Sequence, residues 1–362
     1  MPGTDRSRLL ALIDRLKGRR IVVAGDLIAD EFIYGQIARV SREAPVLILN
    51  YDSTEIVPGG AGNAAANAAA LGGTVRAIGL AGRDDTGRLL LDTLHRRRVD
   101  VTGVARPASY RTPTKTRILA GGIHSAKQQV VRIDRAAAAA ADDAARVAFN
   151  RRVLRAVRSA DALLVSDYGS GLVTPALVDD VRKVFRRFRR KAQAPSRRGR
   201  ANVNSSGSLR LQAEGVILVD SRYQLLRYRG MSACTPNESE VEHALGVRIG
   251  ENTRTLERSG REVLRRTRAD AVLVTRGSRG MALFEPDAAT DHIPIFGSDQ
   301  IADVTGAGDT VIATMTLALA AGASVGDAAR LANVAGGLVV MKRGTATVSA
   351  AELRQALAGA AE

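Results

Sequence analysis

The sequence predicts an α/β fold, a three-layer α/β/α sandwich on a mostly parallel sheet with a small β lid. From residue 162 onward, short apolar strands alternate with helices, which is typical of a parallel sheet covered on both faces. Within residues 32–51, and again within 114–133, strand-like runs follow one another with no helix between them. These two segments therefore indicate a second, separate sheet. We expect one domain over residues 1–362.

Hydrophobic periodicity and glycine punctuation place the elements. The β-branched run 21–24 is a buried strand that ends at Gly25, and the glycines at 59–60 lead into an Ala-rich helix that stops at 72–73. Further core strands are expected at 75–80, 162–166, 215–220 and 271–275. Helices are expected at 86–97, 136–158, 174–188, 238–245, 259–268, 308–321, 325–342 and 350–358.

Composition excludes several classes of protein. One cysteine, Cys234, rules out a disulfide framework, and four scattered histidines make a His-based metal site a poor explanation. Residues 1–20 are too charged for a signal peptide, and the uncharged stretch 311–326 is too short to span a membrane. We therefore expect a cytoplasmic protein with no membrane partner.

The net charge of +16 raises the alternative of nucleic-acid binding. However, 47 of the 53 cations are Arg, which resembles a coding bias, and there is no Trp for base stacking. Ten of the cations lie between residues 182 and 200, where there is no acid. We interpret residues 186–214 as an exposed, disordered basic insertion, and do not expect a nucleic-acid partner.

The most informative motif is Asp303-Val304-Thr305-Gly306-Ala307-Gly308-Asp309, directly before an apolar helix. Glycines let successive backbone N–H groups turn toward one point, and the helix N-terminus favours an anion there. A carboxylate in such a place can accept a proton from a hydroxyl that attacks phosphorus. Asp309 is thus a candidate base, and Gly306, Ala307 and Gly308 are candidate anion donors. The alternative is an ordinary N-capping aspartate.

Two earlier motifs are candidate ligand-binding positions, and the carboxylate of the second could hold sugar hydroxyls. Gly59 and Gly60 allow close approach of the backbone to a polar ligand, and Asn63 can both donate and accept hydrogen bonds. Asp30 follows the first strand, at the strand end where α/β folds bind ligands. Tight turns and a loop cap are the alternatives.

Later positions are candidates for nucleotide contacts. Asn237 and Glu240 are three residues apart on a starting helix and could organise Mg²⁺-bound water, although a capping box explains them equally well. Thr275, Gly277 and Asn333 are weaker candidates.

These motifs, in this order, resemble those of the ribokinase-like (PfkB) sugar kinases, over about residues 21–349. The runs 39–46, 127–134, 166–169 and 343–349 are similar to the heptose-7-phosphate kinase branch. The resemblance implies ATP-dependent phosphorylation of O1 of D-glycero-D-manno-heptose 7-phosphate, with Mg²⁺, possible use of a monovalent cation, and a homodimer formed through the lids. Another sugar or a nucleoside as acceptor, and a non-catalytic relative, remain alternatives.

The sequence departs from that branch at two lysines. Ser170 replaces the lysine of Asp-Tyr-x-Lys-Gly, and Arg222 that of Val-Asp-Pro-Lys. The lid cations Arg39, Arg42, Lys115 and Arg117 are candidates to hold a substrate phosphate, with solvated strand faces as the alternative. Because no HxGH-type motif occurs, we expect no nucleotidyltransferase activity.

Overall fold

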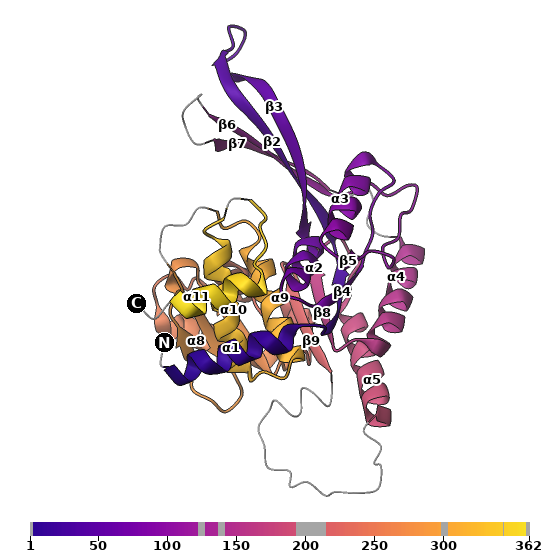
Figure 1. Ribbon diagram of the computed structural model, residues 1–362, viewed down its shortest axis with the longest axis vertical. Coiled ribbons are helices and arrows are strands. Elements are labelled where there is room, and N and C mark those ends of the chain that lie inside the picture. The colour runs from indigo at the N-terminus through magenta and orange to yellow at the C-terminus, as the bar shows by residue number, and fades with distance from the viewer. Residues whose placement is uncertain are drawn as a thin grey trace, which may run out of the picture.

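The computed structural model describes residues 3–121, 127–136, 142–192, 215–297, 303–342 and 344–359, without the side chains of 3–5 and 189–192. In this part of the chain the main sheet has nine strands in the order β13-β12-β11-β10-β9-β8-β1-β4-β5 (Figure 1). They are β1 (Arg20–Gly25), β4 (Thr74–Ile78), β5 (Val99–Asp100), β8 (Ala162–Asp167), β9 (Val216–Ser221), β10 (Ala233–Cys234), β11 (Ala271–Thr275), β12 (Met281–Phe284) and β13 (Asp291–Ile293). Only β12 runs against the others.

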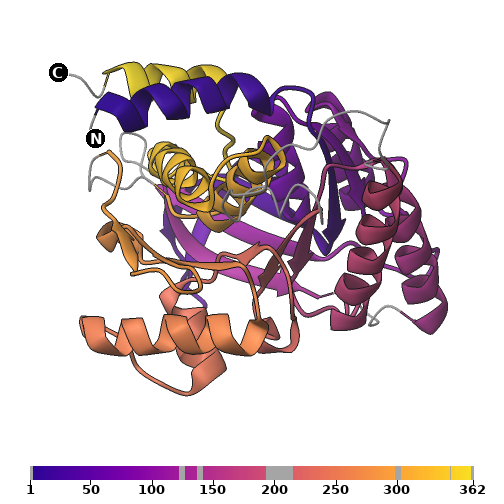
Figure 2. The ribbon, with the colours of Figure 1, turned by 90° about the horizontal axis from the view of Figure 1, so that it is seen from below.

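Helices cover both faces of this sheet, which confirms the three-layer sandwich (Figure 2). One face carries α1 (Gly3–Leu16), α2 (Ala61–Ala70), α3 (Asp85–Arg96), α9 (Ala307–Ala320), α10 (Val325–Val339) and α11 (Ala350–Gly359). The other carries α4 (Asp143–Ala156), α5 (Pro175–Ala192), α7 (Glu238–Leu245) and α8 (Thr253–Thr267). No helix in these described ranges is long and apolar enough to cross a membrane.

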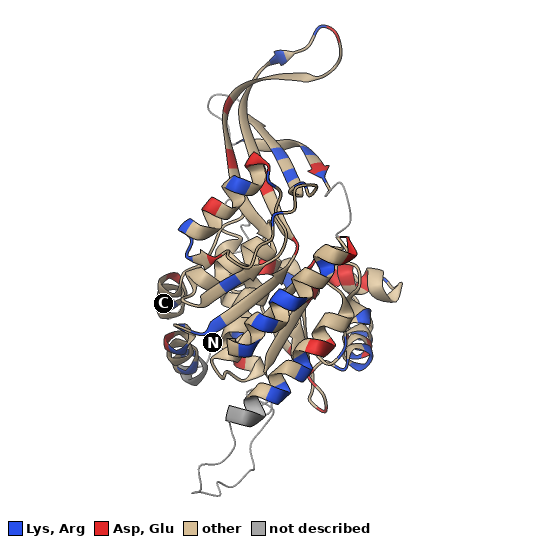
Figure 3. Ribbon diagram, turned by 90° about the vertical axis from the view of Figure 1, so that its right-hand side faces the viewer, with Lys and Arg blue, Asp and Glu red and all other residues tan. Residues whose placement is uncertain are grey.

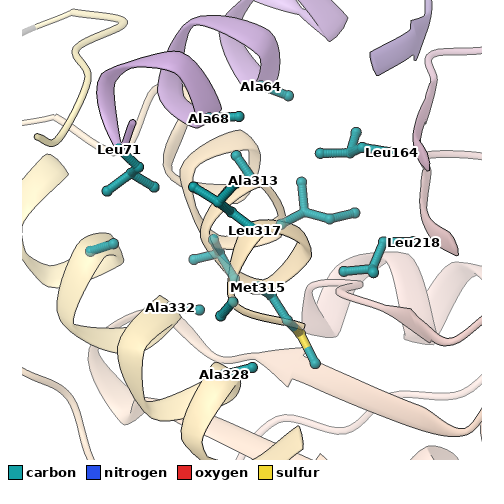
Figure 4. Packing of buried hydrophobic residues seen from close by; sticks show 14 of the residues in the cluster. Ala64, Ala68, Leu71, Leu164, Leu218, Ala313, Met315, Leu317, Ala328 and Ala332 are labelled. Carbon is teal, nitrogen blue, oxygen red and sulfur yellow. The ribbon is translucent and has the colours of Figure 1, made fainter. Parts of the chain in front are cut away.

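The core divides along the sheet because neighbouring strand residues point to opposite faces. Leu164 of β8 packs toward α9, whereas Leu163 packs with the cluster under α4 and α5. Figure 4 shows α9 lying between α2 and α10, with Leu317 and Met315 fully buried among their alanines. Small residues on α2 and α10 allow α9 to lie deep, so its first turn emerges at the carboxyl end of the parallel strands.

A second sheet projects from the sandwich in the order β3-β2-β6-β7 (Figure 1). It consists of β2 (Leu27–Val40), β3 (Leu47–Gly60), β6 (Thr114–Gly121) and β7 (Gln128–Arg135). The lid is confirmed, but the expectation of short strands within 32–51 was wrong. β2 and β3 are each 14 residues long and reach down to the main sheet. The outer halves of both strands are solvent-exposed and lack regular apolar alternation, so the sequence pattern did not show this length.

The two faces of the lid differ in chemistry, as the strand register shows. Directly paired residues share a face, and the pairs Asp30–Lys115 and Arg117–Arg132 make one face charged. Residues on the opposite face include the paired Ile118 and Val131. The charged face is the one that carries the candidate sugar aspartate.

Two other expectations require correction. The helix predicted at 136–158 begins only after Asp142, whose side chain caps it by accepting from the N–H of Ala145 at 2.6 Å. Residues 137–141 lie outside the described residues.

The basic segment 186–214 does not begin as a loop, because α5 continues to Ala192. Phe185 is buried and holds this helix against the sandwich. Figure 3 shows basic positions along the helices of this side, with acidic positions among them. Residues 193–214 lie outside the described ranges. The elements α1, β5, β10, β12 and β13 were not predicted.

Candidate functional site

Asp309 lies in the first turn of α9 and is 5% exposed. Its Oδ2 accepts a hydrogen bond from Nδ2 of Asn63 at 2.9 Å, and its Oδ1 accepts one from the hydroxyl of Tyr168 at 3.2 Å. Burial raises the pKa of Asp309 to about 7, against the lowering effect of these two donors. A carboxyl group that titrates near neutrality suits a general base.

The turn before α9 is shaped by Gly306, which has a φ of 79°. A Cβ at this position would fall 2.4 Å from Nδ2 of Asn63. Glycine is therefore required for Asn63 to reach the base. A Cβ at Gly308 would meet nothing within 4 Å, so the first turn of α9 has open space beside it.

Asp30 lies on β2, on the charged face of the lid, and is 4% exposed. Its Oδ1 accepts a hydrogen bond from Arg117 at 2.6 Å. Gly59 lies beside it, because a Cβ there would fall 2.4 Å from Oδ2 of Asp30. The negative charge of Asp30 also raises the pKa of Asp309, after the larger effect of burial, so the two carboxylates are neighbours. The structure thus brings Asp30, Gly59, Asn63 and Asp309 together, and their roles stay predictions.

A pocket of about 430 Å³ opens beside this group, between the lid and the ends of β8 and β9. Its lining residues include the cations Lys115, Arg132 and Arg222. Arg135 also borders it, but its guanidinium pairs with Glu31 at 3.3 Å. The acidic side chains in its lining are Asp26 and Asp134, and Asp134 already accepts a hydrogen bond from Arg132 at 2.7 Å. The pocket therefore carries an excess of positive charge.

Lys115 illustrates this excess. Burial lowers the pKa of its ammonium group, and the nearby Arg222, Arg132 and Arg117 lower it further, while the charge of Asp30 opposes this lowering. Its Nζ lies 4.8 Å from the centre of the Tyr168 ring. A bound anion would relieve the repulsion among these cations. Of the other lid cations, Arg117 is paired with Asp30, and Arg39 and Arg42 are exposed toward the far end of the lid, outside this pocket.

The two departures from the family pattern, Ser170 and Arg222, differ in whether a cation remains in the pocket. Arg222 keeps a cation in the pocket lining. Ser170 supplies none, and its hydroxyl instead donates to Asp26. Asp26 also accepts from the backbone N–H of Tyr168 at 2.8 Å, so it fixes the loop after β8.

The predicted nucleotide positions form a second group at the ends of β10 and β11. Asn237 and Glu240 form a capping box for α7, with hydrogen bonds of 2.8 and 3.0 Å between backbone N–H groups and side chains. The backbone of Asn237 forms an isolated β-bridge with that of Thr275 at the end of β11. Gly277 follows in a short 3-10 turn. Asn333 lies on α10 and donates to the carbonyl of Pro294 at 2.8 Å, which gives it a structural role.

Asp220 lies near both the group around Asp309 and the predicted nucleotide positions around Glu240. It lies at the carboxyl end of β9, and burial raises its pKa well above the ordinary value, with further contributions from the charges of Glu240 and Asp309. Within the described residues, no group of three His, Cys, Asp or Glu side chains is arranged to hold a metal ion.

Comparison with known proteins places this geometry in a family. The model for pfkB family carbohydrate kinases matches residues 20–352. The chain belongs to this family. It is therefore a carbohydrate kinase, a phosphotransferase that acts on a sugar hydroxyl.

Several curated relatives support the same assignment. The kinase is 36% identical over 353 residues to a protein from Geobacter metallireducens named "Bifunctional protein HldE". The matched region covers 96% of this chain and 65% of that protein. It is 37% identical over 339 residues to a protein of the same name from Caulobacter vibrioides, covering 93% and 63%. The kinase thus spans just under two thirds of the length of these relatives.

Solved structures share the fold. The kinase superposes on Arabidopsis thaliana ribokinase, bound to ribose and ATP, with a TM-score of 0.66 at 19% identity, covering 94% of this chain and 99% of that one. Phosphofructokinase-2 from Escherichia coli, with substrates and products, gives a TM-score of 0.67 at 18% identity and the same coverage. These similarities confirm the ribokinase-like sandwich.

Sequence reasoning assigned no role to Asp26, Tyr168, Arg132 or Asp220. Tyr168 and Asp220 stand at the carboxyl ends of β8 and β9, where ligands bind in α/β sheets, so their position was an available signal. Arg132 could be placed in the pocket only once the register of β6 and β7 was known.

Proposed function

We propose that this kinase transfers the γ-phosphoryl group of ATP to O1 of D-glycero-D-manno-heptose 7-phosphate, giving the 1,7-bisphosphate. The observation that carries the proposal is the cationic pocket beside Asp309. A sugar that already bears a phosphate has two ends, one that reacts at the base and one that needs cations. The heptose-7-phosphate kinases, which the sequence resembles, act on such a sugar.

Asp309 is the base in this proposal. Its carboxylate accepts the proton of the sugar hydroxyl as the oxygen–phosphorus bond forms, and the bond from phosphorus to the β-phosphate oxygen breaks, releasing ADP. Backbone N–H groups of Gly306, Ala307 and Gly308 stabilise the charge on the transferred phosphoryl group. Asp30 and Asn63 position the sugar, and Gly59 and Gly60 let the backbone approach it.

Asn237, Glu240, Thr275 and Gly277 are proposed to border the nucleotide, with Asn333 supporting the same region. Mg²⁺ neutralises phosphate charge when bound. Glu240 and Asp220 suit a hydrated ion, since they offer carboxylates near each other without a complete set of direct ligands. A monovalent cation and a cytoplasmic location stay predictions, as does the absence of a nucleic-acid partner.

The outer face of the lid supports a homodimer. Val131 and Ile133 of β7 are 43% and 44% exposed, and Ile118 of β6 lies on the same face. Exposed apolar strand surface is unfavourable in water unless it is covered. We propose that a second copy of the chain covers this face with its own lid.

The Asp309→Asn variant tests the base. We expect kcat to fall by roughly 10²- to 10⁴-fold, because the amide cannot accept the proton, with ATP affinity retained. In the wild type, kcat should rise with pH through about 7, since Asp309 must be ionised and its pKa is raised to that value. Measured turnover near that of the wild type would contradict the assignment.

The Arg222→Gln variant tests the phosphate pocket. We expect KM for the heptose phosphate to rise roughly 10- to 100-fold, because a charge-assisted hydrogen bond contributes about 1.5–3 kcal/mol, while KM for ATP stays within about twofold. Arg151→Gln on the exposed face of α4 is the matched control. An equal loss with unphosphorylated heptose would argue against a phosphate at this position.

Analytical ultracentrifugation tests the dimer. We expect the wild type to sediment as a dimer, and the double variant Val131→Glu, Ile133→Glu as a monomer, because charges cannot be buried in an apolar interface. Val147→Glu, on exposed α4, should remain dimeric. A monomeric wild type at tens of micromolar protein would contradict the proposal.

A further inference from the structure

Tyr168 is the residue that touches the base without having an assigned role. Its hydroxyl donates to Oδ1 of Asp309 at 3.2 Å, while Asn63 donates to Oδ2 at 2.9 Å. Among the described residues each carboxylate oxygen therefore has a protein donor, and the two donors fix the plane of the carboxylate.

The ring of Tyr168 is itself held in place. Asp26 accepts from the backbone N–H of Tyr168 and, at 3.3 Å, from that of Ser170, so the loop after β8 is tied to the end of β1. A Cβ at Gly60 would lie 3.3 Å from Cε2 of the ring, which shows how closely the ring packs on that backbone. Lys115 lies over the ring at 4.8 Å.

The phenol stays protonated at this position and can donate to the ionised carboxylate of Asp309. Burial raises its pKa well above the ordinary value, and the charge of Asp309 raises it further, so the hydroxyl keeps its proton. A hydrogen bond from a neutral donor stabilises the ionised form of the carboxylate that accepts it. The other groups that act on Asp309 are Asn63, Asp30 and Lys115, and Asp220 lies near enough to interact with it.

We propose that Tyr168 is a positioning residue, which holds the Asp309 carboxylate in its ionised form and in a fixed orientation toward the sugar hydroxyl. This rests on the proposed role of Asp309 as the base. Asp26 acts one step further away, since it fixes the loop from which Tyr168 reaches the base.

The pH dependence of kcat for the Tyr168→Phe variant tests this role, with saturating ATP and a sugar that the wild type phosphorylates. Loss of the donor should raise the pKa of Asp309, so the midpoint of the ascending limb should move up by about one pH unit. The rate should recover at high pH to within about tenfold of the wild type. A merely structural residue would lower kcat equally at every pH.

Tyr228→Phe is the matched control. Tyr228 is also buried, and its hydroxyl also donates to a carboxylate, that of Asp167 at 2.8 Å. This variant should keep the wild-type midpoint. Circular dichroism and thermal unfolding of both variants report whether each is folded.

The outcomes separate the two proposals. If Asp309→Asn is inactive and Tyr168→Phe keeps the wild-type midpoint, the positioning role is overturned and the base assignment stands. If Asp309→Asn keeps wild-type kcat, the base assignment itself is wrong. A shifted midpoint in Tyr168→Phe alone, with Tyr228→Phe unchanged, supports the positioning role.

Discussion

The burial of one carboxyl group at the start of an apolar helix constrains the rest of this site. Residues 309–319 of α9 are all buried, and hydrogen bonds hold the Asp309 carboxylate at the start of this helix. There the unpaired N–H groups of the first helical turn favour negative charge. Asn63 and Tyr168 complete the surroundings from α2 and from the loop after β8. Three segments distant in sequence must therefore meet within one hydrogen bond of the same group.

The lid supplies the other half of the chemistry through the simple alternation of strand residues. Its inner face carries Asp30, Lys115 and Arg132, and its outer face carries Ile118 and Val131. One sheet can thus bind a charged ligand on one side and offer an apolar surface on the other. Because β2 and β3 begin and end at the main sheet, the inner face is fixed relative to the base.

Much of this arrangement was predictable from local pattern. The glycine turn before α9, the sugar aspartate and the alternation of strands and helices all depend on short segments whose chemistry is visible in sequence. The extent of β2 and β3 was not predictable in this way, because their outer halves are solvent-exposed and lack apolar alternation. The start of α4 was missed because alanine propensity favours a longer helix, whereas the Asp142 cap sets the boundary. The links from Asp26 to Ser170 and from Tyr168 to Asp309 join positions more than 140 residues apart, and only the packed sheet reveals them.

Burial adjusts Asp309 to work as a base near neutral pH. The most direct measurement is a ¹³C NMR titration of the aspartate side-chain carboxyls in the folded protein, with the Asp309→Asn variant used to assign the resonance. We expect one carboxyl resonance that titrates with a midpoint at about 7 and that is missing from the variant. A midpoint near the ordinary value of about 4 for this resonance would contradict it.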